Sequence, residues 1–336
     1  MGSIRPIMIA CIKTAEPLPE ISILMAVYEP RMDWLRIQLN SLNAQTYPKL
    51  RLYIRDDCSP KVPFGNIEQM AEACITAFPF TIVRNDQNLG SNGTFERLTQ
   101  EAEGDLFAYC DQDDEWLPEK LTVLQSELAR TGSLLACSDM FVMDGDGHIT
   151  ADSITKVRRH HVFHSGTGLA GGLIFRNFVT GCTMLVDARI AKESVPFCPY
   201  LVHDQYLALR CAEQGSILSV DRSLIRYRIH GGNQTGALSG ITDKKSYERI
   251  RIDDSMTRLK WLGEHLPMGR IEQQDLKIGL AWVDARQRHW HHQGGLTTLW
   301  KYRRFGPLTV LFETVAPWLP EGLFQWVIRM RKKTAK

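Results

Sequence analysis

The sequence predicts an α/β protein with a mainly parallel, Rossmann-like sheet flanked by helices, followed by a C-terminal helical extension. Two observations support this fold class. From residue 21 onward, short apolar runs rich in β-branched residues alternate with amphipathic segments of roughly 10 to 15 residues, which is typical of strand–helix–strand units. After residue 240 the pattern becomes helical and rich in arginine and lysine. Such sheets bind ligands beyond the carboxyl ends of their strands.

Each element is indicated by its own pattern. Residues 21–27 form an apolar run that predicts a buried strand, and Leu35, Leu39 and Leu42 then fall on one helical face, with Asp33 placed to cap that helix. Pro118 suits the first turn of a helix over 119–130, and residues 144–147 have the composition of a tight turn between two strands. The other expected strands cover residues 50–54, 80–84, 106–110, 134–143, 183–186, 216–220 and 224–229, and the other expected helices cover 68–77, 94–102 and 201–214.

Composition excludes several classes of protein. The chain has 336 residues, of which 44% are hydrophobic and 23% charged, and this balance excludes collagen-like, low-complexity and wholly disordered chains. Its eight cysteines are scattered singly, with no CxxC pair of the kind that structural zinc sites and redox motifs use. A chain of this length needs no disulfide to hold its core, so we expect free thiols and a reducing, cytoplasmic compartment.

Charge is distributed unevenly along the chain. Residues 1–240 carry 22 basic and 28 acidic side chains, whereas residues 241–336 carry 18 and 10. We therefore expect a leader over residues 1–20, a sheet domain over 21–240 and a basic helical extension over 241–336. The leader is too short and too interrupted for a signal peptide or a membrane span. The basic extension points to an anionic partner, with a lipid surface and nucleic acid as the two candidates.

The end of the chain combines apolar and basic side chains. Apolar residues, among them Trp318 and Trp326, recur between residues 308 and 328 and precede a cluster of arginine and lysine. Glu313 and Pro317 interrupt this segment too early for a transmembrane helix. Two interpretations stay open: a helix lying in a membrane interface, and a helix packed on the sheet domain with a basic end.

The most informative motif is the run of acids after the strand at 106–110. Asp111, Asp113, Asp114 and Glu115 fill four of five positions, and carboxylates this close repel one another unless a cation or a hydrogen-bonding ligand receives them. Carboxylate oxygens suit Mg²⁺ or Mn²⁺, which keep open positions for phosphate oxygens. The placement after a strand favours such a site over a solvated acidic turn.

A second acidic pair, Asp56 and Asp57, follows the strand at 50–54. In a parallel sheet both acidic sites lie at one edge, where one could bind a base or ribose while the other holds a metal and a diphosphate. The sequence therefore predicts a nucleotide cleft, although Asp is also a common turn former. His160, His161 and His164 are spaced too loosely to favour a metal site, and solvated positions are expected for them.

A series of motifs along residues 20–236 resembles the family 2 glycosyltransferases of GT-A fold, and within them the rhamnosyltransferase-like members of bacterial surface polysaccharide pathways. The motifs that carry the resemblance are Ala26-Val27-Tyr28-Glu29-Pro30, Gln45-Thr46-Tyr47-Pro48, Arg55-Asp56-Asp57-x-Ser59, Asn85-x-x-Asn88-Leu89-Gly90, Cys110-Asp111-Gln112-Asp113-Asp114-x-Trp116-Leu117-Pro118-Glu119-Lys120, His203-Asp204 and Tyr227-Arg228-x-His230-Gly231-x-Asn233. Each motif is short, but their order along the chain is specific.

The resemblance implies a role for each matching residue. The donor nucleotide-sugar would be bound by Tyr28, Glu29, Asp56, Asp57, Asn88, Gly90, Asp111, Asp113 and Asp114. Asp111 and Asp113 would form the family's DxD motif, with Asp113 as the direct metal ligand, Asp111 nearer the ribose and His230 approaching the diphosphate or metal. Asp204 matches the catalytic base of inverting members. His203 stands where many relatives have Glu, and Glu29-Pro30 departs from the commoner Asn-Gly.

The resemblance and the residues together predict an inverting, Mg²⁺- or Mn²⁺-dependent glycosyltransferase. It would transfer a sugar, with dTDP-rhamnose as one candidate donor, to a glycan or lipid-linked acceptor in surface polysaccharide biosynthesis, from a cytoplasmic or peripheral position at the inner face of the membrane. A nucleotidyltransferase would share the acidic site, but residues 26–31 offer no Gly- and Lys-rich phosphate loop. A non-catalytic nucleotide-sugar binding module stays open. A nucleic-acid binder is disfavoured because no known module surrounds the basic tail.

Overall fold

A computed structural model describes residues 17–158, 161–230, 240–266 and 269–334. Within these ranges nine strands form one sheet, in the order β3-β2-β1-β4-β8-β6-β9-β5, with β7 paired to β6. The strands β1, β2, β3, β4, β6 and β9 run in one direction, and β5, β7 and β8 run against them. The bounds of the strands are β1 Ile21–Val27, β2 Leu50–Asp56, β3 Phe80–Arg84, β4 Leu106–Cys110, β5 Glu115–Trp116, β6 Leu135–Met143, β7 Ile149–Ala151, β8 Met184–Asp187 and β9 Ile217–Arg228.

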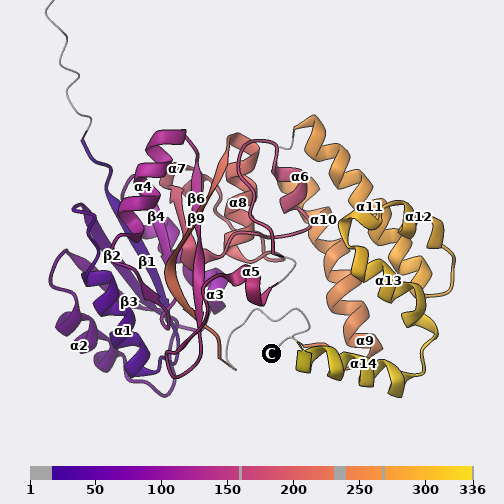
Figure 1. The fold of residues 1–336 in the computed structure, drawn as a ribbon, viewed down its shortest axis with the longest axis horizontal. Coiled ribbons are helices and arrows are strands. Elements are labelled where there is room, and N and C mark those ends of the chain that lie inside the picture. The colour runs from indigo at the N-terminus through magenta and orange to yellow at the C-terminus, as the bar shows by residue number, and fades with distance from the viewer. Residues whose placement is uncertain (1–16, 159–160, 231–239, 267–268, 335–336) are drawn as a thin grey trace, which may run out of the picture.

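Helices cover both faces of this sheet, as the alternating pattern predicts (Figure 1). One buried cluster contains side chains of α1, α2 and α4, such as Leu39, Ile67 and Leu124, and the other contains side chains of α3, α7 and α8, such as Phe95 and Leu207. The helices of this part are α1 Met32–Asn43, α2 Phe64–Cys74, α3 Gly90–Glu101, α4 Lys120–Thr131, α5 Ile154–Val157, α6 Ala170–Leu173, α7 Ala188–Glu193 and α8 His203–Gln214.

Several predictions about single elements are wrong. Asp33 does not cap α1, because Arg31 occupies the cap position, where no side chain makes a capping bond, and Asp33 instead forms an ion pair with Arg31. The strands expected at 216–220 and 224–229 are one strand, β9, whose exposed middle residues interrupt the apolar pattern. The short elements β5 and α7 were not expected. The turn at residues 144–147 does join two antiparallel strands, β6 and β7.

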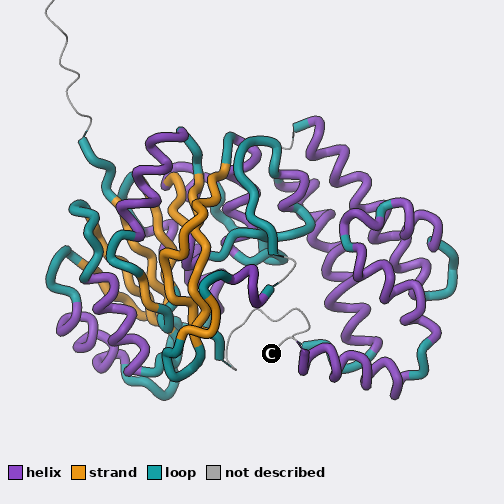
Figure 2. The backbone as a smooth tube through the Cα atoms, viewed as in Figure 1, coloured by secondary structure: helices purple, strands orange, loops and turns teal. Residues whose placement is uncertain are grey.

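After residue 240 the structure is helical, in agreement with the sequence pattern. Figure 2 shows these helices gathered at one end of the molecule, beyond the strands. Their bounds are α9 Lys244–Tyr247, the π-helical turn Glu248–Asp253, α10 Asp254–His265, α11 Arg270–Trp290, α12 Leu296–Lys301, α13 Pro307–Val315 and α14 Glu321–Thr334, with single 3₁₀ turns at Arg303–Phe305 and Ala316–Trp318. Among the described residues no helix is both long and apolar enough to cross a membrane.

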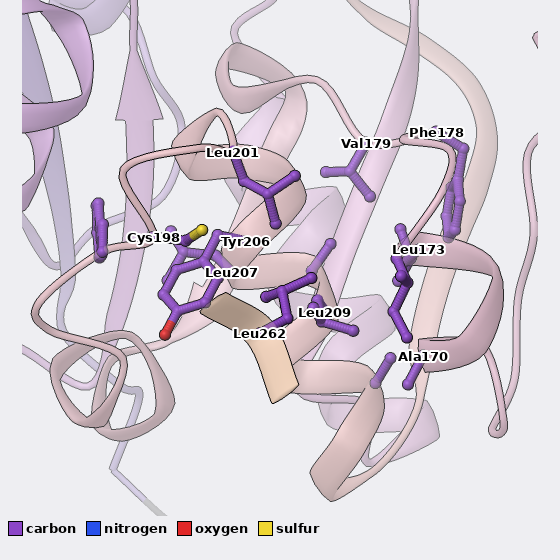
Figure 3. Close-up of a cluster of buried hydrophobic side chains, with 14 of the residues drawn as sticks. Ala170, Leu173, Phe178, Val179, Cys198, Leu201, Tyr206, Leu207, Leu209 and Leu262 are labelled. Atoms are coloured by element: carbon purple, nitrogen blue, oxygen red, sulfur yellow. The ribbon is translucent and has the colours of Figure 1, made fainter. Parts of the chain in front are cut away.

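The C-terminal helices share a hydrophobic core with the sheet part. One continuous buried cluster runs from Leu24 in β1 to Ile328 in α14. Figure 3 shows the junction, where Leu262 of α10 lies close to Tyr206, Leu207 and Leu209 of α8. The helices α10 and α11 are therefore packed against the sheet part through α8 and α6, whereas α13 and α14 contact α9, α11 and α12.

Inside the C-terminal helices a buried ion pair joins α11 to α13. Arg286 and Glu313 are 3% and 2% exposed, and their side chains are linked by two hydrogen bonds of 2.6 and 2.8 Å. The Tyr247 hydroxyl donates to the same carboxylate at 2.9 Å. A buried pair of this kind is costly to break, because either partner alone leaves an uncompensated charge.

Candidate active site

The acidic run lies on the loop between β4 and β5, at the carboxyl end of a strand in the middle of the sheet. One ligand atom from each of Asp111, Asp114 and Cys182 lies within 4.8 Å of the others. Burial, followed by the charges of Asp113 and Asp204, raises the pKa of Asp111 to about 7. The loop therefore holds more negative charge than the surrounding protein stabilises, as the sequence predicts for a cation site.

Asp114 and Cys182 form the buried side of this cluster. Asp114 is inaccessible to solvent, and its Oδ1 accepts the backbone N–H of Arg228 at 2.9 Å. Burial is also the main reason that the pKa values of Asp114 and of the Cys182 thiol lie well above their usual ranges. A thiol that keeps its proton is a poor metal ligand, so the hard oxygen atoms of the aspartates fit Mg²⁺ or Mn²⁺ better than a softer metal.

A buried lysine lies beneath the acidic loop. Lys120, the first residue of α4, is inaccessible to solvent, donates to the carbonyl oxygen of Cys182 at 2.6 Å and lies 3.0 Å from the centre of the Trp116 ring. Burial lowers the pKa of its ammonium group to about 7, while the charges of Asp114 and Asp111 act in the opposite direction. The lysine thus offsets part of the negative charge from the protein side and leaves the other side of the loop for a ligand.

The third acid of the run, Asp113, lies next to His230. Asp113 Oδ2 is 2.7 Å from His230 Nε2, although the two residues are 117 positions apart in the sequence. Trp34 of α1 packs against the His230 ring at 5.0 Å and against the guanidinium of Arg228 at 4.8 Å, and Arg228 donates to the carbonyl oxygen of Asp113 at 2.8 Å. Because β9 ends at Arg228, this strand carries both basic side chains to the acidic loop.

Asp204 is the second residue of α8, and its carboxylate is bound on one side by protein donors. Oδ1 accepts from the Asn177 amide at 2.9 Å and from the Gln205 backbone N–H at 2.6 Å, and Oδ2 accepts from the Gly181 backbone N–H at 3.0 Å. A carboxylate has about four acceptor positions, so Oδ2 retains one. Burial raises the pKa of Asp204 to about 6, against the effect of these three hydrogen bonds. This carboxylate is ionised at neutral pH and basic enough to accept a proton.

His203, the other member of the His-Asp pair, points into the protein. It is 8% exposed, and its ring lies 4.2 Å from Phe95 and 5.3 Å from Tyr109. A Cβ at Gly181 would come within 2.6 Å of His203 Nε2, so a larger residue there would displace the ring or the loop. Burial lowers the pKa of His203 to about 3, which keeps the ring neutral. The residue supports the loop that holds Asp204.

The second acidic pair is also at the carboxyl edge, one strand beyond β1, and both of its side chains are buried. Asp56 accepts from the hydroxyl and the backbone N–H of Ser59 and lies 3.5 Å from Arg84. Asp57 accepts from the Asn85 amide and from the backbone N–H groups of Leu89 and Gly90, at 2.7 to 2.9 Å. Asp57 therefore fixes the start of α3, where Gly90 adopts a positive φ of 72°. Asn88 also contacts this residue and donates to the Asp57 carbonyl oxygen at 3.3 Å.

The loop after β1 connects the two acidic sites. The Tyr28 backbone exchanges two hydrogen bonds with the Gln112 amide, at 2.7 and 3.0 Å, and the Tyr28 side chain is 44% exposed. Glu29 has a φ of 45°, and its carboxylate accepts the backbone N–H groups of Lys61 and Val62. An exposed aromatic ring thus stands between two acidic sites on a loop that is fixed from both sides.

The structure brings most of the predicted residues to one edge of the sheet. Asp111, Asp113, Asp114, Asp204 and His230 gather around the loop after β4, and the six other predicted residues surround the loops after β1 and β2. His161 and His164 lie against Phe163 and Phe178 and are in no cluster of metal-binding side chains among the described residues, whereas His160 is outside the described residues.

Sequence reasoning missed residues that position the site. Asn177 and Gly181 hold Asp204, and Trp34 packs on His230, but none of the three was singled out. Asn177 lies in a stretch without periodic pattern, so the sequence carried no signal for it. Trp34 lies beside the apolar face of its helix and resembles an ordinary core residue.

Comparisons with known proteins find a matching family model, a similar sequence and similar folds. Residues 22–188 match the family model described as Glycosyl transferase family 2. The chain is 23% identical over 216 residues to the UDP-Glc:alpha-D-GlcNAc-diphosphoundecaprenol beta-1,3-glucosyltransferase WfaP of Escherichia coli, and the match covers 63% of this chain and 78% of that protein.

Solved structures with a similar fold include TarS 1–349 of S. aureus in complex with UDP-GlcNAc, with a TM-score of 0.57 at 14% identity, covering 94% of this chain and 88% of that one. They also include the mannosyltransferase PcManGT of Pyrobaculum calidifontis in complex with GDP-Man and Mn²⁺, with a TM-score of 0.56 at 14% identity, covering 95% of this chain and 86% of that one. At these identities the comparison establishes the fold, and the predicted GT-A fold class is confirmed.

Proposed function

We propose that this chain, whose residues 22–188 form a family 2 glycosyltransferase domain, is an inverting, metal-dependent transferase that takes its sugar from a nucleotide-diphosphate donor. The observation that carries the proposal is the position of Asp204. Its carboxylate is close enough to the acidic loop to raise the pKa of Asp111, and it keeps one free acceptor position while three protein donors hold it in place.

The metal is proposed to be Mg²⁺ or Mn²⁺, held by Asp113 and Asp111 with His230 beside them. The support is the donor set, which consists of crowded carboxylates with a histidine 2.7 Å from one of them. A divalent ion in this place would neutralise charge on the leaving diphosphate. On the protein side, the backbone N–H of Arg228 holds Asp114, and Lys120 donates to the neighbouring carbonyl oxygen of Cys182.

The role proposed for Asp204 is that of general base. Its Oδ2 would accept the proton of an acceptor hydroxyl as that oxygen forms its bond to the anomeric carbon and the bond from this carbon to the diphosphate breaks, with the electron pair leaving on the diphosphate. Attack from the side opposite the diphosphate inverts the anomeric configuration. A base with a pKa near 6 suits this step, because it is ionised at neutral pH and still accepts a proton.

The nucleoside end of the donor is proposed to lie along the loops after β1 and β2. Tyr28 offers an exposed ring for stacking, and Asp57 and Asn88 hold the turn whose backbone N–H groups, including that of Gly90, begin α3. Glu29 and Asp56 fix the surrounding loops. Asp114 is proposed to act through the acidic loop, since it is fully buried.

The donor sugar and the acceptor are proposed from the similarity to WfaP and from the family resemblance. WfaP uses UDP-glucose and an acceptor linked to diphosphoundecaprenol, according to its name. For this chain we propose UDP-glucose and dTDP-rhamnose as the first donors to test, and a glycan or lipid-linked acceptor in surface polysaccharide biosynthesis. A lipid-linked acceptor requires the reaction to occur at the membrane, with the protein on the side where nucleotide sugars are made.

The test is a donor panel with a matched pair of variants. UDP-glucose, UDP-GlcNAc, GDP-mannose and dTDP-rhamnose are incubated with the protein and Mn²⁺ or EDTA, and released nucleoside diphosphate and pyrophosphate are measured separately. Release of nucleoside diphosphate that needs Mn²⁺ and is lost in Asp204→Asn supports the proposal. Asp187→Asn is the control, because Asp187 also accepts a backbone N–H at a helix start, that of α7. Release of pyrophosphate, or full activity of Asp204→Asn, would contradict it.

A further inference from the structure

The C-terminal helices expose an unusual number of large apolar side chains. Among the described residues, those on α12 to α14 and the turn between α13 and α14 that are at least 40% exposed are Leu296, Trp300, Leu308, Leu311, Val315, Trp318, Leu323, Trp326 and Met330. We call the seven of these from Leu308 to Met330 the apolar face. Two are tryptophans, exposed by 58% and 53%. Seven large apolar side chains exposed along two successive helices exceed ordinary scattered exposure and point to an interaction site.

The spacing of these residues shows that each helix has two apolar sides. In α13 the exposed residues Leu308, Leu311 and Val315 follow the i, i+3, i+7 spacing of one helical face, whereas Val310 on the opposite side is buried. In α14 the exposed residues are Leu323, Trp326 and Met330, with the same spacing, whereas Phe324 and Ile328 are buried. A helix that only packs on its own domain needs one apolar side, whereas each of these helices carries a second apolar side that is exposed.

The charges around the apolar face are almost all positive. Residues 296–334 contain seven basic and two acidic side chains, and one of the acids, Glu313, is neutralised by the buried Arg286. Exposed basic residues flank the face in the sequence, with Lys301, Arg303 and Arg304 before α13 and Arg329 on α14; of these, Arg304 forms an ion pair with Asp275 of α11 at 3.4 Å. This combination of apolar surface, tryptophan and positive charge is complementary to an anionic bilayer surface.

We propose that α13 and α14 bind an anionic phospholipid surface, with the apolar face inserted among the headgroups and the neighbouring basic residues on the lipid phosphates. The absence of a membrane-spanning helix among the described residues is compatible with helices that lie in the plane of the interface. In Figure 1, α13 lies beyond α10 on the side away from the strands, and α14 runs below α9 with its C-terminal end toward the sheet part. The inference rests on the membrane location in the proposed function but not on its chemistry.

The experiment is sedimentation of the full chain with vesicles. Vesicles of phosphatidylcholine alone are compared with vesicles that contain phosphatidylglycerol, at low and high salt. We expect binding to the anionic vesicles that weakens with salt. The double variant Trp318→Ser/Trp326→Ser should bind at least tenfold more weakly, and Arg329→Gln about fivefold more weakly, the contribution of one basic residue near an anionic surface.

Two substitutions on α1 serve as matched controls. Ile37→Ser removes an apolar side chain that is 40% exposed, and Arg36→Gln removes an exposed charge, both far from the apolar face in the sequence. Thermal unfolding verifies that each variant folds, and metal-dependent hydrolysis of the donor in the absence of vesicles reports the active site independently.

Several outcomes would overturn the inference. These are equal binding of the double variant and the intact chain, equal binding to neutral and anionic vesicles, and loss of binding in the controls. Dimerisation through the apolar face without any vesicle binding, detected by light scattering, would also overturn it. Loss of donor hydrolysis with intact vesicle binding would instead contradict the proposed function alone.

Discussion

Removing the charge of Asp111 should stabilise the metal-free protein at alkaline pH. The pKa of this carboxyl is raised from 3.8 to about 7, mainly by burial and then by the charges of Asp113 and Asp204. Each pKa unit corresponds to about 1.4 kcal/mol, so ionised Asp111 costs on the order of 4 kcal/mol in the folded state. Asp111→Asn keeps the shape of the side chain and removes this cost.

The pH dependence has a definite sign. A carboxyl whose pKa is higher in the folded than in the unfolded state favours folding below the unfolded value, and this contribution is lost as pH rises through the folded value. The loss at Asp111 therefore occurs between about pH 4 and pH 7. We expect Asp111→Asn to melt about 5 to 8 °C above the unsubstituted protein at pH 8 in EDTA, and less than half as far above it at pH 5.

Metal should narrow this difference to less than half. Mn²⁺ at a hundred times its dissociation constant stabilises a binding protein by about 2.7 kcal/mol, and Asp111→Asn should lose most of that gain. Differential scanning fluorimetry at both pH values, with Mn²⁺ or EDTA, measures four melting temperatures for each protein. Asp221→Asn is the control, because Asp221 is an exposed carboxylate outside the site. The electrostatic reasoning fails if Asp111→Asn melts lower at pH 8 without metal, or if its response to Mn²⁺ equals that of the unsubstituted protein.

Three further predictions concern the base, its supporting loop and the C-terminal helices. Asp204→Asn should lower kcat by ~10²–10⁴ and leave the donor Kd unchanged, which donor titration checks. In the unsubstituted protein kcat/KM should rise with pH as Asp204 ionises, at about pH 6 or below once a cation is bound. This rise should be absent from the pH profile of Asp204→Asn. Gly181→Ala should lower kcat at least tenfold, because the Cβ of the alanine would lie 2.6 Å from His203 Nε2 and displace the backbone N–H that Asp204 accepts. Gly172→Ala is the control and should leave kcat unchanged, because Gly172 has open space around it. Glu313→Gln should lower the free energy of unfolding by about 3 kcal/mol in urea titrations, since it leaves Arg286 buried without a counter-charge, and an unchanged value would show that the pair is dispensable.

The central part of the fold could be predicted because its strands are buried on both faces. In β1 six of seven residues are buried, and β4 is buried from Phe107 onward, so each appears in the sequence as a continuous apolar run. Strand β9 does not appear as a continuous apolar run, because Asp221 and Arg222 are exposed in its middle and its pairing with β6 shifts register near Ser138 and Asp139. A polar interruption in a long strand has the same pattern as a turn between two short ones.

The acidic loop was predicted because its chemistry is visible in one short segment, whereas Asp204 was predicted only from the family resemblance. The residues that hold these side chains in place were not predicted, because they come from distant parts of the chain. Asn177 reaches Asp204 across 27 residues and His230 reaches Asp113 across 117, and neither distance leaves a local pattern. The involvement of Asp57 in starting α3 was missed for the same reason, since it depends on a contact with residues 85–90.

The shared core between α8 and α10 means that the end of the family match is not the end of an independently folding unit. The family match stops at residue 188, yet Leu207 and Leu209 of α8 are covered by Leu262, far beyond it (Figure 3). A chain cut after the last strand would expose the apolar side chains of α8 to water and would be prone to aggregate. Exchange of the C-terminal helices between homologues would therefore need matching changes on α6 and α8, so the two segments are expected to diversify together.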